Sequence, residues 1–229
     1  MLIVFEDERL VAVSKPVDRV VIPGRGEVGE PLRDEAERLL GRKLLIVHRL
    51  DREASGLVVF AKDADAHRAL CAGFRGRSIH KTYLALVQGS LAEDGEIRSP
   101  LREFGSGRTA VDPAGKPSLT RYTVREKFSH ATLLEASPVT GRRHQLRAHL
   151  YSIGHPVLGD ARYGKERPVG NAPRLMLHGL EMSFKGPGGK AVVLRAEPQA
   201  DFLKVLELYR CASASAPFSA SAGGPLTPS

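Results

Sequence analysis

The segment from His48 to Leu57 contains the acidic side chain that is best placed to do chemistry. Asp51 lies between Arg49 and Arg52 in the order His-Arg-Leu-Asp-Arg-Glu-Ala-Ser-Gly-Leu. A carboxylate between two guanidinium groups stays ionised, which suits a nucleophile or a general base better than an acid. Taken by itself, the segment is more typical of a surface loop whose aspartate forms a salt bridge. Other parts of the sequence must decide between these two interpretations.

A second segment, residues 140–150, combines basic side chains with a helical pattern. Its order is Thr-Gly-Arg-Arg-His-Gln-Leu-Arg-Ala-His-Leu, and the apolar spacing predicts a helix over residues 142–153. Arg143, Arg147 and Tyr151 would follow one another along one flank of this helix, facing either solvent or a cleft. The start of the helix would also present unpaired N–H groups to an anion.

Two histidines in the second segment raise the question of a metal site. His144 and His149 are five positions apart, which places them on different sides of a helix, whereas helical zinc motifs space their histidines by four. The two cysteines, Cys71 and Cys211, are far apart and suggest neither a zinc site nor a disulfide framework. We therefore predict that the protein holds no metal.

The elements around both segments are mainly strands. Short apolar runs at 44–47 and 58–61 are typical of buried strands, so Asp51 would lie at the rim of a sheet. Further strands are predicted at 2–5, 10–14, 79–87, 122–124, 131–136, 175–184 and 191–194, and helices at 31–40, 63–74 and 200–210. Side chains expected to face inward from the first and last of these helices are Leu32, Ala36, Leu39, Leu40, Phe202, Leu203, Val205, Leu206 and Tyr209.

The composition is that of a soluble globular protein with a basic surface. A chain of 229 residues can form one large domain or two lobes that share a sheet. Its 34 Lys and Arg exceed its 26 Asp and Glu, which favours a polyanionic partner. We predict one domain at 1–210 and a disordered tail at 211–229, which is rich in Ala, Ser, Gly and Pro. No apolar run is long enough to span a membrane and no secretion signal is visible, so a cytoplasmic protein is expected.

Two further segments, taken with the two described above, form a series of motifs that is similar to that of a known protein family. Residues 81–89 contain Lys-Thr-Tyr at the start of a strand, and residues 154–160 read Gly-His-Pro-Val-Leu-Gly-Asp. Together with 48–57 and 140–147, they resemble the signatures of the RluA-type pseudouridine synthases. Those signatures are His-Arg-Leu-Asp-x-x-Thr-Ser-Gly-Leu, Lys-x-Tyr, and Thr-Gly-Arg-x-His-Gln-(Ile/Leu)-Arg followed by Gly-His-Pro-x-x-Gly-Asp. The two long motifs are specific, and the resemblance covers roughly residues 1–195.

Three positions depart from the family pattern. Ala54 stands where the family usually has Thr, Asp18 where Gly usually follows a Lys-Pro pair, and Arg143 where a small residue or Thr is usual. None of these changes removes a reactive group, so the activity is still expected. The loop around Asp51 is the place where the geometry would differ.

The resemblance implies an α+β domain with the pseudouridine synthase fold. Its sheet would be long, bent, mixed and mostly antiparallel, with flanking helices and a catalytic cleft across its middle. The implied reaction breaks the N1–C1′ bond of a uridine in RNA, rotates the base and rejoins it through C5. Because this isomerisation involves neither redox change nor net hydrolysis, no cofactor is expected.

The resemblance also implies roles for individual residues. Asp51 would be the catalytic carboxylate, which either adds covalently or abstracts a proton. Arg147 would pair with Asp51 and keep it ionised, and Tyr83 would stack on the target uracil. Arg49 would fill the space left by the flipped uridine. Further RNA contacts are expected from His48, Lys81, Arg142 and Arg143.

Ribosomal RNA is the expected substrate, with transfer RNA next, and the protein is expected to act as a monomer. One alternative is an inactive RNA-binding or RNA-folding protein with the same fold. Such a relative would be expected to lack Asp51, Tyr83 or Arg147, and all three are present. A second alternative, a hydrolase or nuclease, would need another acid near Asp51 or a metal cluster, and Glu53 is expected to point elsewhere.

Overall fold

The structure is a computed structural model that describes residues 1–24, 29–164, 172–186 and 189–214. The strands in this part of the chain are β1 (Leu2–Glu6), β2 (Leu10–Lys15), β3 (Leu45–Ile46), β4 (Ser55–Ala61), β5 (His80–Gln88), β6 (Gly95–Ile97), β7 (Leu101–Glu103), β8 (Thr109–Val111), β9 (Thr120–Lys127), β10 (Ala131–Pro138), β11 (Leu177–Lys185) and β12 (Ala191–Arg195). The helices are α1 (Leu32–Leu40), α2 (Ala64–Arg75), α3 (Gln145–Ser152) and α4 (Ala200–Ala214).

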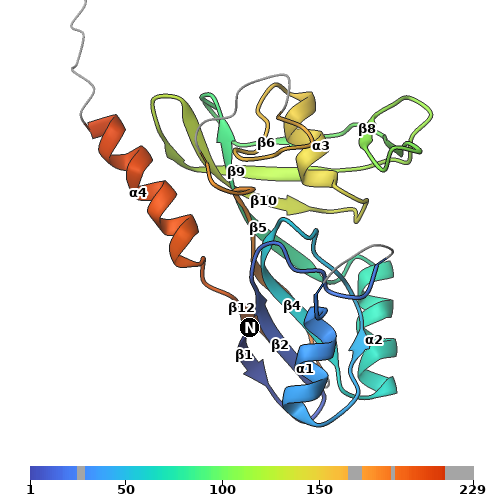
Figure 1. The fold of residues 1–229 in the computed structure, drawn as a ribbon. Helices are drawn as coiled ribbons and strands as arrows, with labels where there is room; N and C mark the ends of the chain where they lie inside the picture. The colour runs from blue at the N-terminus through green and yellow to red at the C-terminus, as the bar shows by residue number, and fades with distance from the viewer. Residues whose placement is uncertain (25–28, 165–171, 187–188, 215–229) are drawn as a thin grey trace, which may run out of the picture.

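A ten-stranded sheet runs through the molecule in the order β1-β2-β4-β11-β5-β10-β9-β6, with β12 paired to β11 and β3 to β4. Its neighbouring strands are antiparallel except for β4 and β11, which run parallel. In Figure 1, α1 and α2 lie beside the half that contains β2 and β4, and α3 lies beside the half that contains β9 and β10. A mixed, mostly antiparallel sheet with flanking helices confirms the predicted α+β fold.

The central pair of strands is held unusually close by two glycines. All seven residues of β4 are buried, which explains its continuous apolar sequence. Gly56 has a φ of +120°, and a Cβ added there would lie 2.3 Å from the carbonyl oxygen of Gly179 on β11. Only glycine fits this position without strain or collision. The close pairing fixes the start of β4, and with it the segment that carries Asp51, against the middle of the sheet.

Local signals for two helices are confirmed. Asp63 accepts a hydrogen bond from the backbone N–H of Ala66 at 2.8 Å and so caps α2. Gly41 ends α1 in the left-handed conformation, with a φ of +64°. No helix in the described parts of the chain is long and apolar enough to cross a membrane.

Other details of the predicted elements were wrong. The apolar run 44–47 forms only the two-residue strand β3, and α4 continues through 211–214, which were predicted to belong to a disordered tail. The rest of that tail lies outside the described residues. Leu39 is 56% exposed because it lies about 60° round α1 from the buried Ala36, on the side away from Leu40, which packs against the core. Leu203 is 48% exposed because it lies about 100° round α4 from the buried Phe202.

Candidate active site

A cavity of about 570 Å³ lies between the segment before β4 and the segment before α3. The end of α2, the start of β5, the end of β10, the start of α3 and the start of β11 also contribute to its lining. The structure brings all of the predicted site residues to this one cavity: His48, Arg49, Asp51, Lys81, Tyr83, Arg142, Arg143 and Arg147. Segments almost one hundred positions apart in the chain therefore meet around one hollow, as Arg147 and Asp51 illustrate.

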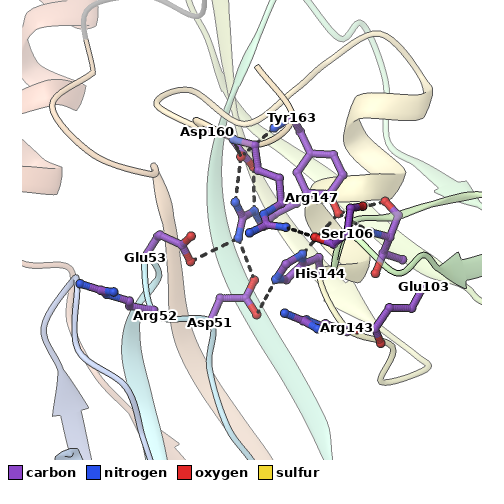
Figure 2. Close-up of polar contacts among 12 residues, drawn as sticks. Asp51, Arg52, Glu53, Glu103, Ser106, Arg143, His144, Arg147, Asp160 and Tyr163 are labelled. Carbon is purple, nitrogen blue, oxygen red and sulfur yellow. Dashed lines mark hydrogen bonds and ion pairs between the residues drawn. The ribbon is translucent and has the colours of Figure 1, made fainter. Parts of the chain in front are cut away.

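Asp51 and Arg147 form an ion pair at the wall of the cavity. The guanidinium NH1 of Arg147 donates to Oδ2 of Asp51 at 3.3 Å (Figure 2). The side chain of Arg147 is 2% exposed and that of Asp51 is 25% exposed, so the arginine is buried behind a carboxylate that reaches the cavity. The flanking arginine Arg52 extends away from Asp51 in Figure 2. The cation that pairs with Asp51 is thus distant in sequence, as the resemblance implied.

Asp160 holds Arg147 from the side opposite Asp51. Nε and NH2 of Arg147 donate to the two oxygens of Asp160 at 2.7 and 2.8 Å, and the side chain of Asp160 is fully buried. Oδ1 of Asp160 also accepts from the backbone N–H groups of Arg162 and Tyr163. Burial by itself lowers the pKa of Arg147, but the hydrogen bonds and charge of Asp160, aided by Asp51, raise it above its ordinary value.

Sequence reasoning gave Asp160 no role, although it closes the Gly-His-Pro-x-x-Gly-Asp motif. It also misjudged Glu53, whose Oε2 lies 3.4 Å from NH1 of Arg147, on the same nitrogen that Asp51 uses. The prediction that Glu53 points elsewhere was wrong, because both acids reach the same nitrogen of Arg147 from the turn before β4. Glu53 is not among the residues that line the cavity, so among the residues that the structure describes only Asp51 presents a carboxylate there.

Tyr83 and Lys81 lie on the same face of β5, as the strand alternation predicts, and both line the cavity. Tyr83 is 8% exposed, so its ring is fixed by packing. The ammonium of Lys81 lies 6.0 Å from the centre of the Tyr83 ring and 5.8 Å from that of Phe74. An aromatic ring beside a cation, in a cavity that an acid also lines, is an arrangement that can stack a planar base.

His48 braces the Asp51 segment against β4. Its Nε2 accepts from the backbone N–H of Val59 at 2.9 Å, which places the ring proton on Nδ1. Burial, together with the charge of Lys81, lowers the pKa of His48 to about 3, so the ring is neutral at physiological pH. His48 therefore contributes shape and hydrogen bonding to the cavity wall but no positive charge.

Lys15 ties the same segment to β2. Its buried ammonium donates to the carbonyls of Pro16, Arg19 and Arg52 at 2.8–2.9 Å, and the last of these follows Asp51 directly. Burial lowers the pKa of Lys15 to about 7, against the opposing charge of Asp51. The turn after Lys15 contains Asp18 with a φ of +55°, which accounts for the glycine usual at this place in the family. Aspartate tolerates this conformation better than most residues, so the departure leaves the turn intact.

The segment before α3 differs from the prediction. The helix begins at Gln145 and not at Arg142, because His144 adopts a left-handed conformation with a φ of +51°. Oε1 of Gln145 instead accepts from the backbone N–H of Arg142 and from the hydroxyl of Thr140. His144, which the sequence raised only as a metal ligand, lines the cavity with Nε2 3.9 Å from Oδ1 of Asp51.

The remaining basic residues of this segment have different surroundings. Arg142 lines the cavity and its NH2 donates to the carbonyl of Pro117 at 3.4 Å. Arg143 forms an ion pair with Glu103 on β7, so this departure from the family pattern links α3 to the β7–β8 hairpin. His149 lies elsewhere, buried, with its ring nitrogens 2.9 Å from the Thr120 hydroxyl and the Ser99 carbonyl.

The sheet topology and the placement of this cavity define a protein of the pseudouridine synthase type. A solved structure, human RNA pseudouridylate synthase domain containing 4, superposes on 91% of this chain with a TM-score of 0.76 and 26% identity, and the match covers 93% of that chain. The family model described as RNA pseudouridylate synthase matches residues 9–152. The chain belongs to this family, and the resemblance found in its motifs is confirmed.

Curated relatives place the chain more closely within the family. Ribosomal large subunit pseudouridine synthase D of Nitrosomonas europaea is 38% identical over 218 residues, which is 89% of this chain and 63% of that protein. Ribosomal large subunit pseudouridine synthase C of Escherichia coli (strain K12) is also 38% identical over 218 residues, or 89% of this chain and 68% of that protein. The chain therefore spans less than two thirds of the length of the Nitrosomonas protein.

Proposed function

We propose that this chain is an RNA pseudouridine synthase that isomerises uridines in structured RNA, with ribosomal RNA as its substrate. The observation that carries the proposal is the pair formed by Asp51 and the buried Arg147 at the wall of a cavity that Tyr83 also lines. The names of the curated relatives, which act on the large ribosomal subunit, support the choice of ribosomal RNA over transfer RNA.

Each step of the isomerisation has a residue suited to it. Arg147 pairs with Asp51, whose carboxylate can attack C1′ or C6 of the uridine, or take up a proton. Tyr83 would stack on the uracil and hold the ring while it turns. Arg49, exposed at the edge of the cavity, would fill the gap that the flipped nucleotide leaves in the RNA.

The basic rim of the cavity would supply the affinity for RNA. Lys81, Arg142 and Arg143 line it together with Arg75 and Arg77, which follow from the end of α2. Contacts from these cations to phosphates would offset the few kcal/mol, on the order of 2–4, that unstacking a base costs. Binding should therefore weaken steeply as the salt concentration rises.

The proposal extends to the oligomeric state, the cofactor requirement, the domain bounds and the location of the protein. All the groups given a role lie on one chain, which supports action as a monomer. The chemistry assigned to them needs no cofactor, since the reaction has no net redox change. We place the catalytic domain at residues 1–214, up to the end of α4. We place the protein in the cytoplasm, where ribosomal RNA of the relatives' kind is assembled.

Asp51→Asn tests the proposal. The variant should lose turnover, measured as hydrogen release from C5 of labelled uridine and as pseudouridine mapped in the RNA. Its affinity for RNA should stay within about twofold of the unchanged protein, since one uncharged substitution alters no phosphate contact. Full turnover in the variant would end the assignment of Asp51. RNA binding without any pseudouridine, in the unchanged protein, would favour the inactive RNA-binding alternative.

A further inference from the structure

His144 is turned into the cavity by an unusual backbone conformation. Its φ of +51° is rare for residues other than glycine, and such strain is concentrated at functional sites. Although His144 occupies the position before the first turn of α3, its side chain makes no capping hydrogen bond. The ring is instead 9% exposed and packs edge-on against Tyr163, with ring centres 6.1 Å apart.

The contacts of Tyr163 determine which nitrogen of His144 carries a proton. The Tyr163 hydroxyl donates its single proton to the carbonyl of Thr109 at 2.9 Å and accepts from the Thr109 N–H at 3.1 Å. Its remaining lone pair faces Nδ1 of His144 at 3.3 Å. Nδ1 must therefore be the donor in this contact, which leaves a bare lone pair on Nε2.

That lone pair faces the reacting carboxylate. Nε2 of His144 lies 3.9 Å from Oδ1 of Asp51, while Oδ2 of Asp51 is engaged by Arg147 (Figure 2). Two acceptors thus face each other beside the cavity with no proton between them. A proton that arrived on Nε2 would be stabilised by the charge of Asp51.

The surrounding charges keep His144 neutral until such a proton arrives. Burial is the largest influence and lowers the pKa of His144 below its ordinary value, while the charge of Asp51 opposes this. The guanidinium groups of Arg143, Arg147 and Arg162 lower it further. A neutral imidazole with a free nitrogen in the cavity is the form that a general base requires.

We propose that His144 is the base that removes the C5 proton of the rotated uracil, an inference that rests on the proposed synthase function. When the base rejoins the sugar, C5 becomes bonded to C1′, and it is bonded to C6 throughout. Whichever of these two carbons Asp51 attacks, C5 is one bond away from it. A base whose nitrogen lies 3.9 Å from Asp51 would therefore be within reach of the hydrogen on C5.

The proposed step is balanced in protons and electrons. Nε2 of His144 takes the C5 proton, and the electron pair of the C5–H bond forms the C5=C6 double bond. The pair displaced from C6=N1 goes to N1, which takes up a proton from water. The imidazolium then returns its proton to water, so no net proton is gained or lost and Asp51 is left ionised.

His144→Asn separates this role from a structural one. The side-chain amide nitrogen of asparagine can replace Nδ1 as the donor to Tyr163, whereas nothing replaces Nε2. We expect turnover to fall about 10²–10⁴-fold with the KM for RNA little changed. Deprotonation should become rate-limiting, so RNA labelled with deuterium at C5 should show a primary kinetic isotope effect larger than in the unchanged protein. The activity loss below pH 6.5 that depends on His144 should disappear from the variant's pH profile.

His130→Asn is the matched control, because His130 is exposed and lies outside the cavity lining. If His144→Asn does not fold, His144→Gln serves as the second variant, and circular dichroism decides between them. Turnover within threefold of the unchanged protein would overturn the inference, and so would a loss without an enlarged isotope effect. If the kinetic isotope effect were enlarged in Tyr83→Phe and not in His144→Asn, the base would be Tyr83. Absence of pseudouridine with the unchanged protein would instead mean that the proposed function has failed.

Discussion

Replacing Asp160 by asparagine tests whether Arg147 is held in place from behind the cavity. Asparagine has nearly the same shape, but it has no charge and its NH2 group would face a guanidinium donor. Removing one partner of a buried ion pair costs about 3–5 kcal/mol. Because Asp51 and Glu53 still pair with Arg147, we expect the lower part of that range, about 3–4 kcal/mol. For a domain of this size, this corresponds to a melting temperature lower by about 6–16 °C.

The loss would be measured by urea and thermal unfolding, followed by circular dichroism. The matched control is Glu126→Gln, which breaks the pair between Arg210 and Glu126 at 2.9 Å. Those side chains are 46% and 34% exposed, so the control should lose no more than about 1 kcal/mol. A difference between the two variants isolates the effect of burial, since both lose one carboxylate that pairs with an arginine.

Catalysis provides a second measurement on Asp160→Asn. An arginine that is free to shift would hold Asp51 less well, so kcat should fall more than the affinity for RNA. The free energy of unfolding of Asp160→Asn could instead lie within 1 kcal/mol of that of the unchanged protein, as is expected for Glu126→Gln. The bidentate contact with Asp160 would then not be what neutralises the buried Arg147. The account of the site would then have to rest on Asp51 and Glu53 alone.

Three further outcomes are expected. Gly56→Ala would bring a Cβ to 2.3 Å from the Gly179 carbonyl oxygen at a φ of +120°, so little folded protein should be recovered, measured as soluble yield. Burial lowers the pKa of His178, so the unfolded chain binds a proton at this histidine more tightly than the folded protein does. The stability contributed by neutral His178 should be complete above pH 6.5. At lower pH the free energy of unfolding, measured with urea, should decrease by up to about 1.4 kcal/mol per pH unit. Glu103→Gln would release Arg143 from its ion pair to contact RNA phosphate, so affinity at low salt should rise several-fold and the salt dependence should steepen by about one charge, measured by filter binding.

Much of the fold could be predicted because its signals are local. The capping side chain of Asp63 and the glycine that ends α1 act on their own turns, and the alternation in β5 correctly put Lys81 and Tyr83 on one face. Which residues line the cavity could also be predicted, because these residues belong to the motifs that resemble the family. The pairing of β4 with β11 could not, since it depends on Gly56 and Gly179 meeting across more than a hundred residues.

The details of the site depend on contacts that no local pattern specifies. Four-residue spacing put Arg147 on a flank facing a cleft or solvent, yet it is 1% exposed, because Asp160 supplies a carboxylate from beyond the end of α3. The same spacing extended the helix through His144, whose left-handed conformation goes with contacts to Tyr163 and Asp51 that lie far away in the sequence. Helical periodicity assumes that charged side chains stay in water, and an active site is where that assumption fails.

The division of Arg147 among three carboxylates explains how one buried cation can serve a reacting acid. Two of its nitrogens are committed to Asp160, and the third is shared by Asp51 and Glu53. In the proposed reaction Asp51 would lose its charge, either by bonding to the uridine or by taking up a proton. An arginine held by Asp51 alone would then be buried and unpaired, at a cost of about 3–5 kcal/mol. Asp160 and Glu53 keep Arg147 neutralised through that stage. Under the proposed function, Asp51 could therefore gain and lose charge in each turnover without loosening the group that positions it.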